Sequence, residues 1–191
     1  MFGKMKIKKY KYLLKKSFNN CDFQKAVKYS DYILNYDDCN LDALYYKADS
    51  LVKLGDLEGA LDIADLIINI KPSCNNLLIK ATFIAFKEDY DIAFSLFDEI
   101  LDKCPNFEKA LINKCYFLYC CEQWDDIISE VNKFLENNPN DSNAYDIKAA
   151  AYESKQDFNK ALIYVNKSLE LDSNNVVALN RKKKILEIID N

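Results

Sequence analysis

The fold is decided by residues 41–72, which read LDALYYKADSLVKLGDLEGALDIADLIINIKP. Leu44, Ala48 and Leu51 recur at three- and four-residue spacings, which places them on one face of a helix. Gly55 then interrupts the pattern and is suited to a helix C-terminal cap. A second apolar helical pattern follows from residue 57 and stops before the proline at residue 72. The stretch therefore predicts two helices joined by a short turn.

A short phrase from this turn recurs five times along the chain. It consists of Asp or Gln, then an aromatic or apolar residue, then an Ala or Ile three residues later. It reads Asp22-Phe23-x-x-Ala26, Asp56-Leu57-x-x-Ala60, Asp89-Tyr90-x-x-Ala93, Gln123-Trp124-x-x-Ile127 and Asp157-Phe158-x-x-Ala161, with the last positions 33 or 34 residues apart. All three prolines lie 12 residues after a last position of the phrase. A fixed period of this size predicts a stacked array of helical pairs.

These residues resemble the tetratricopeptide repeat (TPR) family, whose unit is two antiparallel helices with small, aromatic and proline positions at fixed offsets. The resemblance covers about residues 7–191. It implies an all-α fold, a right-handed α-solenoid of helix-turn-helix units with about 11 helices. The expected organisation is a single solenoid over 1–191, with repeats at 7–40, 41–73, 74–107, 108–141 and 142–175 and a C-terminal capping helix at 176–191.

The chain departs from the family pattern at a few positions. Lys47, Lys80, Lys114 and Lys148 occupy a position that is more often apolar, and Ile127 replaces the usual small residue in the fourth repeat. We interpret these departures as local repacking that leaves the fold unchanged.

Composition agrees with an all-α protein. The 191 residues are 50% hydrophobic and include only 3 Gly and 3 Pro, too few for a fold rich in turns. No apolar run approaches the roughly 18 to 20 residues of a membrane span, and the N-terminus does not have the pattern of a secretion signal. The seven cysteines are odd in number and lack paired spacing, so we expect reduced thiols and a cytoplasmic location.

Enzymatic chemistry finds little support in the sequence. The chain has no histidine, which excludes Ser-His and Cys-His catalysis and most zinc sites. It has no glycine-rich phosphate loop and no C-x-x-C spacing, so we expect no cofactor and no metal. Cys120 and Cys121 leave a thiol-based activity as the last of the alternatives.

The family resemblance implies that the first helix of each pair lines a concave groove. Aligned on Leu44, this face carries apolar and aromatic residues in the middle repeats and Asp146 and Glu153 in the fifth. Exposed apolar patches mark interaction sites, and tyrosines add contact area with a polar tip. We therefore expect a non-catalytic protein-interaction module or adaptor that binds a peptide segment or partner protein through Tyr45, Leu78, Phe86, Ile112, Tyr116 and Tyr119. The alternative for each residue is packing against neighbouring helices.

The sequence can be compared with the residues that bind one specific partner of the family. Members that grip the acidic tail of heat-shock chaperones use Lys and Asn on successive first helices as a carboxylate clamp. The positions equivalent to the clamp are Lys11, Lys15, Tyr46, Asn75 and Ile79, of which only the first matches. The sequence does not support chaperone-tail binding of this type.

Charge is unevenly distributed along the chain. Residues 1–20 carry seven lysines and no acid, whereas the whole chain has a net charge of −4. Lys8, Lys11 and Lys15 could therefore form an electrostatic arm that docks to nucleic acid or an anionic membrane. We disfavour both partners because the acidic remainder repels phosphates. A structural subunit that assembles with copies of itself is the other alternative.

Overall fold

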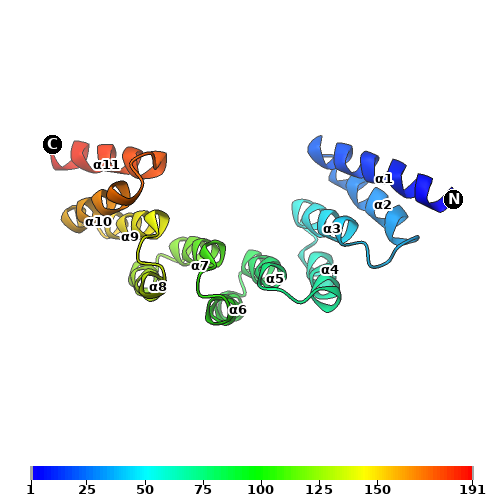
Figure 1. The fold of residues 1–191 in the computed structure, drawn as a ribbon, viewed down its shortest axis with the longest axis horizontal. Coiled ribbons are helices and arrows are strands. Elements are labelled where there is room, and N and C mark those ends of the chain that lie inside the picture. The colour runs from blue at the N-terminus through cyan, green and yellow to red at the C-terminus, as the bar shows by residue number, and fades with distance from the viewer. Residues whose placement is uncertain (1, 191) are drawn as a thin grey trace. The chain divides into compact units, whose positions relative to one another are not determined.

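The structure, a computed structural model, describes residues 2–190, which form eleven α-helices joined by short turns (Figure 1). The predicted all-α solenoid of helix-turn-helix units is confirmed. The helices are α1 (Phe2–Asn19), α2 (Phe23–Leu34), α3 (Leu41–Lys53), α4 (Leu57–Ile70), α5 (Cys74–Phe86), α6 (Tyr90–Lys103), α7 (Glu108–Cys120), α8 (Trp124–Asn137), α9 (Ser142–Ser154), α10 (Phe158–Leu171) and α11 (Val176–Ile189).

The turn inside each helical pair has the same backbone conformation in all five repeats. After α3, the amide of Asp56 donates to the carbonyl of Leu51 at 2.9 Å and that of Gly55 to Val52 at 3.0 Å. This is a Schellman motif, which requires a residue in the left-handed region after the helix. That residue is Cys21, Gly55, Glu88, Glu122 or Gln156, with φ between 58° and 84°. Only one of the five is the glycine that this conformation favours.

The acidic residue of the recurring phrase caps the second helix of its pair. The side chains of Asp22, Asp56 and Asp157 each accept a hydrogen bond from the backbone amide three residues later. Each therefore satisfies an amide that the first turn of a helix leaves without a partner. Gln123, the equivalent residue before α8, makes no side-chain cap hydrogen bond.

Replacing Gln123 with aspartate is expected to raise the free energy of unfolding by about 1 kcal/mol, because it supplies the missing cap. The new carboxylate would also face the positive end of the α8 dipole. Urea denaturation followed by circular dichroism measures the change, with Gln123→Ala as the control that adds no acceptor. An aspartate variant no more stable than the alanine variant would contradict the assignment of residue 123 as the cap.

The chain packs as two compact units, residues 1–96 and 97–191, and the boundary falls within α6. In the first unit, Leu14, Ile33, Leu44 and Ile67 are among the fully buried side chains. In the second unit, the fully buried side chains include Phe97, Leu111, Val131, Val165 and Ile185. The small residues of the recurring phrase, Ala26, Ala60, Ala93 and Ala161, are all 0% exposed, as close helix packing requires.

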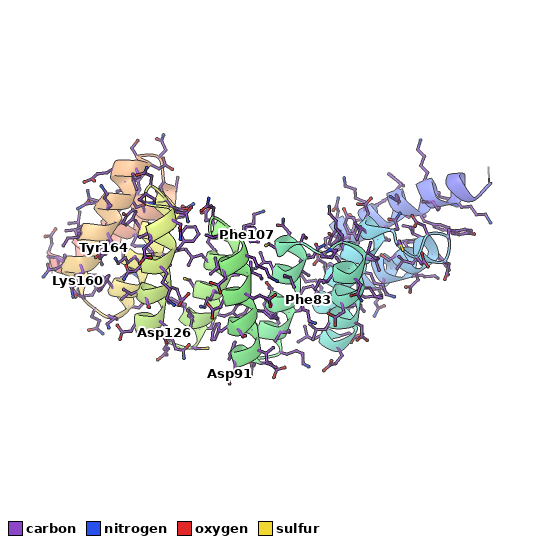
Figure 2. The ribbon with its side chains drawn as sticks, turned by 60° about the horizontal axis from the view of Figure 1, so that its bottom comes forward. Phe83, Asp91, Phe107, Asp126, Lys160 and Tyr164 are labelled. Carbon is purple, nitrogen blue, oxygen red and sulfur yellow. The ribbon has the colours of Figure 1, made fainter. Side chains whose placement is uncertain are left out.

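The four lysines at the unusual position each reach back to a polar residue of the preceding helix. The pairs, which we call the lysine ladder, are Lys47–Asp31 (2.7 Å), Lys80–Asp65 (2.5 Å), Lys114–Asp98 (2.5 Å) and Lys148–Asn132 (2.6 Å). The ladder joins one repeat to the next inside each unit. In the last pair the neutral asparagine is supplemented by the ring of Tyr164, 4.0 Å from the Lys148 ammonium (Figure 2 labels Tyr164 on α10).

Five cysteines are free thiols, namely Cys21, Cys39, Cys115, Cys120 and Cys121. Cys74 and Cys104 are not free thiols, so the expectation that all seven are reduced does not extend to them. Within residues 2–190, no helix combines the length and the apolar character that crossing a membrane would require.

Candidate functional site

The second unit contains an open pocket of about 320 Å³ bordered by α7, α8, α9 and α11. It is lined by Ile112, Cys115, Tyr116, Tyr119, Ile127, Asp146, Ile147, Ala150, Ala151 and Arg181. Most of these residues are apolar, and the charged residues are confined to Asp146 and Arg181. Apolar walls with a few placed polar groups are typical of ligand sites.

The α7 wall presents three large side chains to solvent. Ile112 is 40%, Tyr116 60% and Tyr119 49% exposed, and they lie on one helical face because they are three and four residues apart. The Tyr116 ring packs edge-on against Phe117 with centroids 5.2 Å apart, and the Tyr119 ring against Trp124 at 4.6 Å. These contacts hold the rings in place while leaving much of their surface open.

Small residues on α9 and a buried thiol form the base of the pocket. Ala150 is half-buried and Ala151 is fully buried, so this part of the helix leaves space above it. Burial raises the pKa of the Cys115 thiol to about 12. This thiol therefore stays protonated near neutral pH and serves as a small apolar group, since the thiolate is the nucleophilic form.

A network of charged side chains forms the edge of the pocket between α9 and α11. The Arg181 guanidinium donates to Asp146 at 2.8 and 3.3 Å and to Glu153 at 2.7 Å. Lys184 adds a second ion pair to Glu153 at 2.7 Å. Burial tends to raise the pKa of Glu153, but the hydrogen bonds from Lys184 and Arg181 outweigh it and the pKa is lowered. Both carboxylates at this edge are therefore neutralised by cations.

This network changes one expectation from the sequence. Asp146 and Glu153 were expected to make the fifth repeat an acidic end of the groove, but Arg181 and Lys184 compensate both charges. The sequence analysis missed the role of Arg181. A signal was present, since Arg181 is the only arginine in a chain that otherwise uses lysine, and arginine is the cation best suited to bidentate pairing with carboxylates.

The residues expected in the first unit are in different environments. Tyr45 is half-buried, and its hydroxyl donates to Asn76 at 2.8 Å. Leu78 is only 8% exposed, so it belongs to the packed interior and we remove it from the candidate surface. Phe86 is 47% exposed at the end of α5. Of these three residues, Phe86 is the one that presents substantial apolar surface.

The lysines of the expected electrostatic arm also differ from one another. Lys11 pairs with Asp42 of α3 at 3.0 Å and so helps hold the first repeat to the second. Lys8 and Lys15 are exposed on α1. Among residues 2–190, no group of three or more His, Cys, Asp or Glu side chains is placed to hold a metal ion.

No protein-family model matches the sequence. No curated protein matches it either. Solved structures do match the fold. One is YrrB, a TPR protein with an unusual peptide-binding site, with 18% identity and a TM-score of 0.57 over 91% of this chain and 90% of that one. A MamA structure matches with 18% identity and a TM-score of 0.63 over 88% and 92%. The thermophilic TPR protein TTC0263 of Thermus thermophilus matches with 16% identity and a TM-score of 0.61 over 94% and 98%.

Proposed function

We propose that this chain, which has the tetratricopeptide-repeat fold, is a non-catalytic adaptor that binds a peptide segment of a partner protein in the pocket of its second unit. One observation carries the proposal: three large apolar or aromatic side chains of α7 remain exposed around an open pocket with a small-residue base. Side chains of this kind normally become buried, and exposed clusters of them mark interaction sites.

The pocket suits one large apolar side chain of a bound segment. Its volume of about 320 Å³ lies at the lower end of the range for ligand sites, roughly 300 to 1,000 Å³. Tyr116 and Tyr119 would supply apolar contact area and hydroxyl groups for the backbone of the segment, and tyrosine is enriched among residues that dominate binding energy. The Asp146–Arg181 pair would fix the orientation of a polar group beside the anchor.

Two further observations support binding over catalysis. The only thiol that lines the pocket, Cys115, has a pKa of about 12, and the chain has no histidine to act as a base. YrrB, which shares the fold, has a peptide-binding site. Phe86 in the first unit is a separate candidate contact, and we propose it only as an addition to the pocket of the second unit.

The double variant Ile112→Ala/Tyr116→Ala is expected to weaken partner binding at least about 25-fold, since each truncation removes exposed contact area worth more than about 1 kcal/mol. Helical content should stay native because both side chains are substantially exposed. The measurement is capture of binding proteins from a lysate, identification by mass spectrometry, and titration of the purified partner.

The matched control is Ile163→Ala/Tyr36→Ala, which removes the same two residue types at positions 62% and 51% exposed and outside the pocket. This control should bind like the unmodified protein. If the pocket variant and the control retain the partner equally, recognition lies on another surface and the pocket assignment is wrong.

A further inference from the structure

The outward face of α1 carries an unusual arrangement of a tyrosine among lysines. Tyr12 is 67% exposed, the highest value among the large hydrophobic side chains of residues 6–190, for which side-chain exposure is described. Lys8, Lys9, Lys15 and Lys16 lie three or four residues from it, so all four share its helical face. Each of these lysines is exposed, and none forms an ion pair with another residue that the structure describes.

Packing of the first unit does not account for this face. The apolar side of α1 is directed inward through Leu14, and Lys11 already supplies the ion pair to α3. Residues 1–36 hold nine lysines and two aspartates, whereas the remainder of the chain has a net charge of −11. The face therefore concentrates positive charge around an aromatic ring, which suits an acidic surface with an apolar opening.

A surface of this kind exists in the second unit of the same protein. A pocket of about 220 Å³ between α6 and α8 has apolar walls and an acidic rim. Leu101, Pro105 and Phe134 form the walls, and Asp98, Asp102 and Glu130 contribute three carboxylates against one surface lysine, Lys133. A cavity of about 150 Å³ is enough to hold benzene, so a phenol ring has room in this one.

The carboxylates of this pocket differ in whether a lysine of the same chain already pairs with them. Asp98 and Glu130 both pair with the buried Lys114 of the lysine ladder. Asp102 is exposed and has no ion pair with another residue that the structure describes. Asp102 is therefore the carboxylate best able to receive a lysine from another molecule.

We propose that Tyr12 of one copy inserts into the α6–α8 pocket of a second copy, with the lysines around Tyr12 facing Asp98 and Asp102. The two surfaces are different, so the contact is heterologous and each copy carries one of each surface. Copies then associate head to tail. The contact is small and relies on charge, so the association is weak and sensitive to salt. This interface lies outside the peptide pocket and does not depend on the proposed adaptor function.

A second copy fits the face better than a phosphate-bearing partner does. Membrane-surface helices carry several bulky apolar residues on their buried side, but Tyr12 is the only large hydrophobic residue that is exposed among residues 6–19 of α1. The phosphates of nucleic acid would pair with these lysines, but the net charge of −11 on the rest of the chain repels nucleic acid. The acidic pocket supplies both the opposite charge and a space for the ring.

Complementation between two variants tests the interface. Tyr12→Ala removes the ring and Asp102→Lys reverses the rim charge, and both residues are exposed, so both variants should fold. Each variant alone is expected to self-associate at least about tenfold more weakly than the unmodified protein in sedimentation velocity at low salt. An equimolar mixture is expected to form a dimer, because one variant retains the pocket and the other retains the α1 face.

The control Tyr36→Ala removes a tyrosine that is 51% exposed and lies outside α1, and it should leave association unchanged. The proposal is overturned if the unmodified protein is monomeric at all concentrations. It is also overturned if neither variant weakens association or if the mixture fails to recover a dimer. Binding of α1 to single-stranded oligonucleotide or to anionic phosphatidylserine vesicles, without self-association, would assign the face to that partner instead.

Discussion

Replacing Phe97 with alanine is expected to lower the free energy of unfolding by about 3–5 kcal/mol, the range for removing a buried aromatic ring. Phe97 is 0% exposed and is among the largest fully buried side chains. Its ring stacks on Phe117 of α7 with centroids 6.3 Å apart. The variant loses the free energy gained by moving the ring out of water. It also loses the van der Waals contacts between the ring and the residues that surround the resulting cavity.

Urea denaturation followed by circular dichroism measures the loss. The control is Phe86→Ala, in which the same chemical group is removed from a site 47% exposed, and the expected cost is below about 1 kcal/mol. Since stability in repeat arrays depends on contacts between neighbours, hydrogen exchange should show the loss first in α6 and α7. Equal costs for the two variants would contradict the burial of Phe97.

Replacing Lys114 with alanine is expected to cost about 3 kcal/mol, because it breaks a buried ion-pair network and leaves a carboxylate poorly compensated. The Lys114 side chain is 5% exposed, and its ammonium lies 2.5 Å from Asp98 and 2.7 Å from Glu130. Burial tends to raise the pKa of Glu130, and the hydrogen bonds from Lys114 and Lys133 outweigh it, so the pKa is lowered. Removing Lys114 should therefore move the pKa of Glu130 upward.

The matched variant Lys114→Met keeps the length of the side chain without its charge. It is also expected to cost about 3 kcal/mol, because it removes one partner of the buried network and leaves the Glu130 carboxylate without the Lys114 ammonium. Lys103→Ala removes an exposed lysine paired with Glu99 and should change stability by less than about 0.5 kcal/mol. If the methionine variant is as stable as the unmodified protein, packing of the side chain accounts for the loss in the alanine variant, and the ion-pair explanation is wrong.

The sequence predicted most of the fold because its signals are local and repeat. Residues 41–72 were predicted to form two helices joined by a short turn, and they form α3 and α4. Each proline lies two residues after the end of α4, α6 or α8. Apolar periodicity, capping residues and prolines each determine the structure of only a few neighbouring residues, so these signals can be recognised in a single sequence.

Features that depend on contacts between repeats were harder to predict. Leu78 and Ile112 hold equivalent positions 34 residues apart, yet one is 8% and the other 40% exposed. Neighbouring helices decide that difference, and the repeat pattern contains no information about it. The lysines of the ladder were recognised as unusual, but their partners about 15 or 16 residues earlier became evident only when the helices were packed.

The residues of the candidate site were also predicted only in part. Ile112, Tyr116 and Tyr119 were identified from their helical face, and the structure brings them together at one pocket. Arg181 was missed, because its role depends on α11 lying beside α9, and no spacing within α11 indicates this. The left-handed turns were expected only at Gly55, since Cys21, Glu88, Glu122 and Gln156 are not residues that usually signal that conformation.

The tight turn within each pair has a consequence for how the protein opens. Asp56 closes the end of α3 with its backbone amide and starts α4 with its side chain, and Asp22 and Asp157 do the same for their pairs. When such a residue is released, both helices lose a terminal hydrogen bond at once. Fraying of one helix therefore exposes the terminal backbone amides of the other helix. The helical pair becomes the smallest segment that exchanges its amide hydrogens together.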